Sequence, residues 1–433
     1  MITHTADVRT DDASPSDRWY TLAVLTLVYA LNIADRFSVS TLLEPIRLDL
    51  RLSDSSVAWI TGTALALFYV TVGIPVAILA DRANRRNIVA ASLALWSAMT
   101  AFCGLAQNLF QFVLARFGVG IGEAGGTPPS TSIIADKFAA RDRPMAMTLF
   151  ALGAPIGAWL GSELAGAIAE RYHWRTAFLV LGVPGIAIGV LVYLTVREPP
   201  RGRYDVAGPA TARLSLSKAL RMMVSQRSAL HLIAGGAVAT LWGWGLLWWT
   251  PAFLMRSHGM SVGEASAALG PMHLVAGTLA TIATGLLVSP RMAADPRRVV
   301  WLLGGVIALM TIPSILIYST TSKPLAIAML WIVVPAIYFF IGPTLGLLAN
   351  VVPASMRAQT VAVLLFAANI ANLIIAPQGI GFLSDHLAPL LGSNADSLRW
   401  ALVALAPTGF WAAYHYLTSA RTIRQDQAAV SGP

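Results

Sequence analysis

The sequence is poor in charged residues and almost without cysteine. Only 12% of its 433 residues are charged, against roughly 25% in an ordinary soluble protein. In contrast, 56% are hydrophobic and the mean hydropathy is +0.66. This composition excludes a disordered chain and an ordinary soluble enzyme. The single cysteine, Cys103, excludes an intramolecular disulfide and any CxxC metal or redox site.

Further absences concern processing signals and enzyme motifs. Residues 1–18 are polar and contain no apolar core of a signal peptide, so the first helix is expected to serve as its own insertion signal. The seven histidines form no HExxH or HxxxH pair, and neither GxSxG nor GxxxxGK[ST] occurs. These absences disfavour a hydrolase, and the sequence predicts no ATP-driven pump, no cofactor and no metal site. No Asn-x-Ser/Thr acceptor is present, which favours a bacterial inner-membrane protein.

Long apolar runs such as AIAMLWIVVPAIYFFIG (326–342) are what the sequence does contain. A membrane helix needs about 20 apolar residues, whereas the strands of a membrane β-barrel alternate apolar and polar positions over about ten. The sequence therefore predicts an all-α integral membrane protein with twelve transmembrane helices. Their expected ranges are 19–43, 57–80, 87–106, 109–136, 144–170, 175–196, 229–255, 264–288, 299–319, 324–349, 357–384 and 398–419.

The net charge of +9 is explained by membrane topology. Of the 30 Lys and Arg, 21 lie in segments on the side of the two termini, seven lie in loops on the other side, and two lie within helices. Membrane proteins concentrate Lys and Arg in their cytoplasmic loops. We therefore expect both termini in the cytoplasm, and no nucleic-acid partner is needed to account for the charge.

The longest hydrophilic stretch divides the chain into two groups of six helices. We expect a tail at 1–18, a bundle at 19–196, a cytoplasmic linker at 197–228 with a surface helix at SLSKALRMM, a second bundle at 229–420 and a tail at 421–433. The segment that begins at Ala135 aligns without gaps with the segment that begins at Ala349, so that Arg143 falls on Arg357. A repeat of six helices is typical of transporters that bind substrate between two halves.

Short motifs in the first half resemble those of a known superfamily. AILADRANRR (77–86) resembles the loop signature GxxxDRxGRR of the major facilitator superfamily, with Ala77 and Asn84 at the glycine positions. RFGVG (116–120) is similar to its RxxxG motif. GAPIGAWLG (153–161) is similar to its antiporter motif, although Ala154 replaces the usual glycine before Pro155, which leaves the direction of exchange open.

Four further motifs together resemble the Spinster-like lipid transporters. They are NIADRF (32–37), GVGIGEA (118–124), SIIADKFAARDR (132–143) and VREPPRG (196–202). The resemblance implies the major facilitator fold of two pseudo-symmetric bundles, a monomer that works by alternating access, and proton-coupled movement of a lysophospholipid or sphingosine-type amphiphile. It also implies that Asp35, Arg116 and Glu123 serve proton coupling and substrate passage.

Charged residues within helices one and four support this reading. At 1.5 Å per residue, Asp35 and Arg116 lie at similar depths in the outer half of the membrane, and Glu123 lies near its midplane. Each ionised residue at a helix centre costs about 2.5–3.5 kcal/mol on insertion scales, which favours a functional role. We expect Asp35 to pair with Arg116 and Glu123 to bind and release a proton. The alternative is a static ion pair that only locks the two helices together.

Substrate contacts are predicted on four helices, and each has a second interpretation. Arg36 either meets an anionic headgroup or pairs with Asp35 or a helix-end carbonyl. The tryptophans of helix seven form two pairs on opposite faces, Trp242 with Trp249 and Trp244 with Trp248, so at most one pair can line the cavity. Alternatively, all four belong to an aromatic belt at the membrane surface. Asparagines in helix eleven bind substrate or link helices. The predicted substrate-binding residues are Tyr29, Asn32, Arg36, Thr127, Trp242, Trp244, Asn369 and Asn372.

A cytoplasmic gate is implied by the superfamily loop signature. Its predicted members are Asp81, Arg82, Arg85, Arg86 and Arg143, with Asp81 pairing with a neighbouring helix end through Arg143. Alternatively, these residues only anchor the topology of the loop.

The sequence thus predicts a secondary transporter whose partners are the bilayer, protons and a small amphiphile. The main alternative is a proton-coupled carrier of drugs or organic anions. A membrane lipid hydrolase and a substrate-sensing receptor are further alternatives, and a flux measurement separates both from a carrier.

Overall fold

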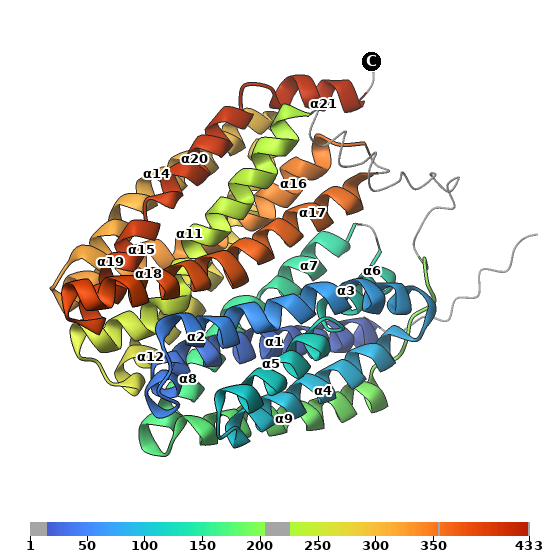
Figure 1. The fold of residues 1–433 in the computed structure, drawn as a ribbon. Helices are drawn as coiled ribbons and strands as arrows, with labels where there is room; N and C mark the ends of the chain where they lie inside the picture. The colour runs from blue at the N-terminus through green and yellow to red at the C-terminus, as the bar shows by residue number, and fades with distance from the viewer. Residues whose placement is uncertain (1–14, 140, 204–225, 354–355, 432–433) are drawn as a thin grey trace, which may run out of the picture.

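The computed structural model describes residues 15–139, 141–203, 226–353 and 356–431, and the regular structure in these ranges is helical (Figure 1). The first half comprises α1 (Pro15–Asp49), α2 (Asp54–Ala58), η1 (Trp59–Thr63), α3 (Ala64–Arg82), α4 (Arg85–Leu105), α5 (Leu109–Glu123), α6 (Thr127–Lys137), α7 (Arg143–Ala151), α8 (Gly153–Arg171) and α9 (Trp174–Thr195). The second half comprises α11 (Arg227–His258), α12 (Val262–Pro271), η2 (Met272–Gly277), α13 (Thr278–Ala294), α14 (Pro296–Ser319), α15 (Lys323–Phe339), α16 (Ile341–Asn350), α17 (Arg357–Ile370), η4 (Ala371–Ile375), α18 (Ala376–Leu391), α19 (Asn394–Leu405), α20 (Thr408–Ser419) and α21 (Ile423–Ser431).

Nine helices in the described ranges are long and apolar enough to cross a membrane. Three other predicted spans lie along α2–η1–α3, α5–α6 and α19–α20, and the last two of these are interrupted. The all-helical prediction is therefore confirmed, whereas the predicted continuous helix at 109–136 is wrong. α5 ends at Glu123 because Gly125 and Gly126 follow it, and α6 starts again just before Pro128 and Pro129, which lack the N–H groups that a continuing helix needs.

The internal repeat is visible in the helix boundaries. α7 begins at Arg143 and α17 begins at Arg357, which are the two residues that the sequence alignment superimposes. A π-helical turn also occurs at a corresponding place in each half, as η1 after α2 and as η2 after α12. Such turns are frequent at functional sites because they reset the direction of the side chains that follow.

The chain segment after the second half is also helical. The sequence predicts a plain tail at 421–433, but α21 occupies Ile423–Ser431 and is tied to the second half. Asp426 accepts a hydrogen bond from the backbone N–H of Ser228 (2.9 Å), and Arg424 pairs with Asp295. The Arg424 guanidinium holds the pKa of the Asp295 carboxyl below its ordinary value of 3.8. The predicted surface helix SLSKALRMM lies outside the described residues.

The two halves have a far end and a linker end. The far end holds the turns near residues 50–53, 172–173, 259–261 and 392–393, and the linker end holds residues 83–84, 138–142 and 196–203. At the far end, the two halves pack closely, through the pairs α8–α12 and α2–α18 (Figure 1). Toward the linker end, the pairs α3–α17 and α7–α13 make few contacts. The halves therefore diverge toward the linker end.

Small residues fix the position of α1, which carries most of the polar residues of interest. Gly157 and Gly161 of α8 lie directly against the backbone of Ala30 and Ala34, so that a Cβ at either glycine would overlap α1. Close helix approach through small residues is typical of membrane bundles. It turns the opposite face of α1, with Asp35 and Arg36, toward α5 and the space between the halves.

Candidate functional site

A cavity of about 680 Å³ lies between the two halves. Its wall on the first half comes mainly from Tyr29, Ile33, Arg36, Phe37 and Ser40 of α1 and from α7. Its wall on the second half comes from α11, α13, α15, α16, α17 and η4, and is mostly apolar and aromatic. Among the described residues, Arg36 is the only charged side chain that lines this cavity.

Asp35 and Arg116 form an ion pair behind this wall, as the sequence predicts. Arg116 Nη1 donates to Asp35 Oδ2 over 2.8 Å, and the two side chains are 0% and 4% exposed. The Thr100 hydroxyl of α4 donates to the other carboxylate oxygen. Sequence reasoning missed Thr100, because a lone threonine in an apolar helix carries no signal. The three residues join α1, α4 and α5.

Arg36 and Glu123 form a second ion pair, about two turns farther along α5 than Arg116. Arg36 donates to the same oxygen, Glu123 Oε2, from Nε (2.9 Å) and from Nη2 (2.7 Å). The Glu123 side chain is fully buried, whereas that of Arg36 is 15% exposed, toward the cavity. Sequence analysis did not name Glu123 as a partner of Arg36. Each acid has its own arginine, because adjacent positions on α1 point about 100° apart.

The two ion pairs leave several buried polar atoms without partners. Within the described residues, Glu123 Oε1 and Arg116 Nε and Nη2 have no hydrogen-bond partner, and neither does Asn32 Nδ2. Leaving a buried polar group unpaired costs about 1–3 kcal/mol, and more when it is charged. Three of these four atoms belong to Arg116 and Glu123, so the two ion pairs do not use the full hydrogen-bonding capacity of these side chains.

The predicted substrate residues divide into two groups. Tyr29, Arg36, Trp244, Asn369 and Asn372 line the cavity. The other three predicted residues are not among the described residues that line the cavity: Asn32, Thr127 and Trp242. Asn32 is 4% exposed and faces the protein interior. Thr127 leaves the polar stripe of helix four because the break at 124–126 separates it from Glu123.

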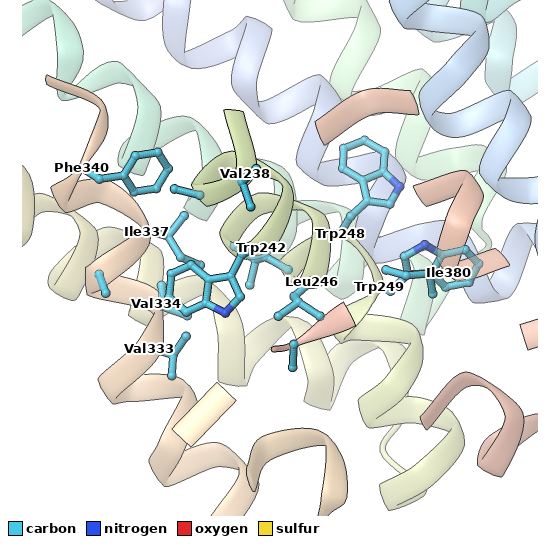
Figure 2. Close-up of a cluster of buried hydrophobic side chains, with 14 of the residues drawn as sticks. Val238, Trp242, Leu246, Trp248, Trp249, Val333, Val334, Ile337, Phe340 and Ile380 are labelled. Carbon is cyan, nitrogen blue, oxygen red and sulfur yellow. The ribbon is translucent and has the colours of Figure 1, made fainter. Parts of the chain in front are cut away.

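Trp242 is part of the core of the second half. It is 0% exposed, its ring lies among Val333, Val334 and Ile337 (Figure 2), and its Nε1 donates to Ser314 Oγ over 3.1 Å. Trp249 is also fully buried. The aromatic-belt interpretation is wrong for these side chains, since a belt requires contact with the membrane surface.

The opposite pair of tryptophans, Trp244 and Trp248, lines the cavity. Trp244 packs edge-to-face on Phe37 of α1 (ring centroids 5.9 Å apart) and on Tyr338 of α15 (5.2 Å). The Tyr338 hydroxyl lies 2.9 Å from His273 Nδ1, and the His273 side chain is buried. Sequence reasoning missed His273 and Tyr338, because no motif marks them and only the fold brings η2 and α15 together.

A second charge cluster lies at the linker end, around Arg85. This side chain is 2% exposed and bonds Asp136 Oδ2 (2.5 Å), Glu198 Oε1 (2.7 Å) and Ser132 Oγ (2.8 Å). Glu198 also accepts the backbone N–H of Arg86 (2.9 Å). The cluster joins α4, α6 and the segment after α9. Asp136 and Glu198 were missed as partners, although they lie in the SIIADKFAARDR and VREPPRG motifs.

The other predicted gate residues have different surroundings. Arg143 Nε donates to the carbonyls of Ala135 (2.8 Å) and Phe138 (3.1 Å) and so contacts the C-terminal end of α6. Arg82 is exposed. The side chain of Asp81 lies outside the described residues, and with it the predicted relation between Asp81 and Arg143.

The family profile of the Major Facilitator Superfamily matches residues 25–376 of this chain. The chain belongs to the major facilitator superfamily. It is therefore a secondary transporter and a multi-pass integral membrane protein, and the prediction that it is not an enzyme is confirmed.

Relatives within the superfamily include an MFS-type efflux pump of Mycolicibacterium smegmatis, which is 31% identical over 96% of both chains. The sphingosine-1-phosphate transporter SPNS2 of Danio rerio is 29% identical over 88% of this chain and 78% of its own length. The structure is similar to that of a bacterial homolog of the human lysosomal transporter Spinster in an inward-facing, unoccupied conformation. That match has a TM-score of 0.84, with 30% identity over 95% of this chain and 99% of the other. The predicted resemblance to Spinster family members is thus confirmed.

Proposed function

We propose that this transporter moves an amphiphile with an anionic headgroup across the membrane by alternating access and couples this movement to protons. In this proposal, α2–η1–α3, α5–α6 and α19–α20 complete twelve spans, in bundles at 19–196 and 229–420. The linker end and both termini face the cytoplasm of a bacterial inner membrane. The transporter works as a monomer, and the Arg85 cluster belongs to its cytoplasmic gate.

The contact between Arg36 and Glu123 carries the proposal. Arg36 is the only charge on the described cavity wall, and its Nε and Nη2 both contact one oxygen of a fully buried carboxylate. When Glu123 binds a proton, it loses the charge that holds Arg36. The guanidinium then becomes available to a phosphate or carboxylate in the cavity, with which it forms strong bidentate hydrogen bonds.

The sign of the coupling follows from this exchange of partners. A proton on Glu123 strengthens the binding of an anion at Arg36, and by reciprocity a bound anion strengthens the binding of the proton. Proton and anion therefore cross the membrane in the same direction. A cationic substrate would instead compete with the proton for Glu123 and would move in the opposite direction.

The apolar wall of the second half supports an amphiphile as the substrate. Leu247, Val288, Ile337, Ile341 and Leu345 face the cavity beside Asn369 and Asn372. Burying an alkyl chain there contributes about 0.8 kcal/mol per methylene. The relative named a sphingosine-1-phosphate transporter fits this class of substrate. We place the headgroup at Arg36 and the alkyl chain along the second half.

A soluble organic anion is the second candidate substrate. A relative of Escherichia coli, 28% identical over 89% of this chain, is named a probable L-galactonate transporter. Such a substrate would use Arg36 in the same way and the two asparagines as hydrogen-bond partners, without filling the apolar wall.

Flux into proteoliposomes with an imposed pH gradient tests the proposal. We expect an anionic lysophospholipid to accumulate inside when the outside is acidic, because proton and anion then enter together. A short sugar acid and a cationic drug are measured in parallel. Accumulation of the sugar acid alone would assign the protein to the organic-anion carriers. Accumulation that requires an acidic interior would contradict the proposed exchange of partners at Arg36.

The length of the alkyl chain provides a further prediction. Gly342 lines the cavity and has open space where a side chain would lie, so that Gly342→Leu is expected to fill part of the cavity without a clash. Each methylene excluded from the cavity costs about 0.8 kcal/mol, or roughly a fourfold loss of affinity. Competition by lysophospholipids of increasing chain length measures this loss.

A matched control is Gly305→Leu. Gly305 also has open space around it, but it is exposed on α14 and does not line the cavity. We expect it to transport like the wild type. Equal losses for short and long chains in Gly342→Leu would place the alkyl chain elsewhere.

A further inference from the structure

Charged side chains from both halves meet at the far end, away from the cavity. Arg256 of α11 donates from Nη1 and Nη2 to the two carboxylate oxygens of Asp54 in α2 (2.8 and 2.7 Å) and from Nε to Glu44 of α1 (2.7 Å). The three side chains are only 6–8% exposed. An arginine of the second half is thus buried between two carboxylates of the first.

The N-terminus of α2 is capped by a side chain of the other half. The Asp385 carboxylate of α18 accepts the backbone N–H groups of Asp54 and Ser55 (2.9 Å each) and the Ser55 hydroxyl (2.6 Å). Ser384 Oγ donates to Asp54 Oδ2 (2.6 Å). The first N–H groups of a helix have no partner within the helix and carry partial positive charge, so a carboxylate there is stabilising. This stabilisation exists only while the halves touch.

A second arginine stands beside the same acids but belongs to the first half. Arg47 of α1 donates to Glu44 through Nε (3.0 Å) and Nη2 (2.8 Å), and its Nε lies 3.7 Å from Asp54 Oδ1. Glu44, Arg47 and Asp54 stay together when the halves separate, whereas Arg256 and Asp385 leave with the second half. Arg47 is therefore placed to replace Arg256 as the partner of Asp54.

We propose that Arg256, Asp54, Glu44 and Asp385 form a clamp that holds the far end closed, and that Arg47 releases it by taking over the acids. The inference rests on the alternating access of the proposed function. It adds that the two arginines act in opposite directions on the same equilibrium. Arg256 contacts Asp54 and Glu44 only in the closed state, so its removal weakens that state. Arg47 contacts Glu44 in both states but is the remaining arginine beside the two acids in the open state, so its removal weakens the open state more.

Distances between spin labels at the far end test this clamp. The measurement needs neither substrate nor a pH gradient, so it remains valid even if the proposed substrate is not transported. In a Cys103→Ser background, the labels are placed at Phe110→Cys, beside the far-end turn between α4 and α5, and at Thr321→Cys, in the far-end turn between α14 and α15. Both positions are exposed. The distance distribution is measured in liposomes by double electron–electron resonance for the otherwise unchanged protein, Arg256→Gln, Arg47→Gln and Arg256→Lys.

We expect Arg256→Gln to raise the ratio of the longer to the shorter distance at least tenfold, equivalent to about 1.4 kcal/mol. Arg47→Gln should lower this ratio, and Arg256→Lys should change it less than Arg256→Gln. An unchanged ratio in Arg256→Gln would overturn the clamp, and a rise in both glutamine variants would overturn the exchange of partners. If Arg256→Gln does not fold, Asp385→Asn removes the charge of the cap and is expected to raise the ratio in its place.

Discussion

Glu123→Gln is expected to fold and to lose all proton-driven accumulation of substrate. With one proton per substrate, a gradient of one pH unit supports up to about tenfold accumulation. Gln cannot bind the proton, so accumulation in the variant should fall to a ratio of about 1. The amide leaves Arg36 without its counter-charge at every pH, and the cavity should still bind the anion. Uptake of labelled lysophospholipid into proteoliposomes measures the ratio.

Exchange of labelled for unlabelled substrate across vesicles without a gradient is the control. Exchange does not require net proton movement, so Glu123→Gln should retain it. Accumulation that persists in the variant would show that the proton binds elsewhere. Loss of both accumulation and exchange would mean that Glu123 is needed for the movement of the halves themselves.

The second large effect concerns the buried pair of Asp35 and Arg116. Arg116→Met leaves the Asp35 carboxylate buried with Thr100 as its remaining partner, and we expect a loss of about 3–5 kcal/mol in stability. The double variant Asp35→Leu/Arg116→Met removes both charges at similar volume. Such replacements are often neutral or stabilising, so thermal unfolding in detergent should return close to that of the wild type.

Transport by the double variant separates the two interpretations of the pair. If Asp35 and Arg116 only lock α1 to α5, a variant with restored stability also regains proton-driven transport. If the pair responds to the proton on Glu123, the double variant is stable but does not accumulate substrate. A double variant as unstable as Arg116→Met would mean that the hydrogen bond from Thr100 matters more than the charges.

The candidate site was partly predictable because charge inside a membrane helix is expensive and therefore conspicuous. Asp35, Arg36, Arg116 and Glu123 stand out in apolar sequence for that reason. Their partners do not follow from depth alone. The sequence places Asp35 and Arg116 at similar depths and Glu123 about two turns deeper along helix four. Only the rotation of α1, which packs against the glycines of α8, decides that Arg36 reaches Glu123 and not Asp35.

Neutral or peripheral residues could not have been assigned from the sequence. Thr100, His273 and Tyr338 resemble ordinary residues of apolar helices, and Arg256 is one of the seven cations that the predicted topology places in loops on the side away from the termini. The break after Glu123 did have a signal, since the two glycines and the two prolines around Thr127 each disfavour a continuous helix.

The sequence by itself determined that the chain is an all-helical membrane protein, that it repeats after 214 residues and that it resembles the Spinster-like transporters. These properties depend on local hydropathy, on charge and on short motifs, which can be read along the chain. The tertiary structure alone decided which charges pair, which tryptophans line the cavity and which end is closed. Those properties depend on how helices far apart in the sequence rotate and pack against one another, which the local sequence of a single segment does not determine.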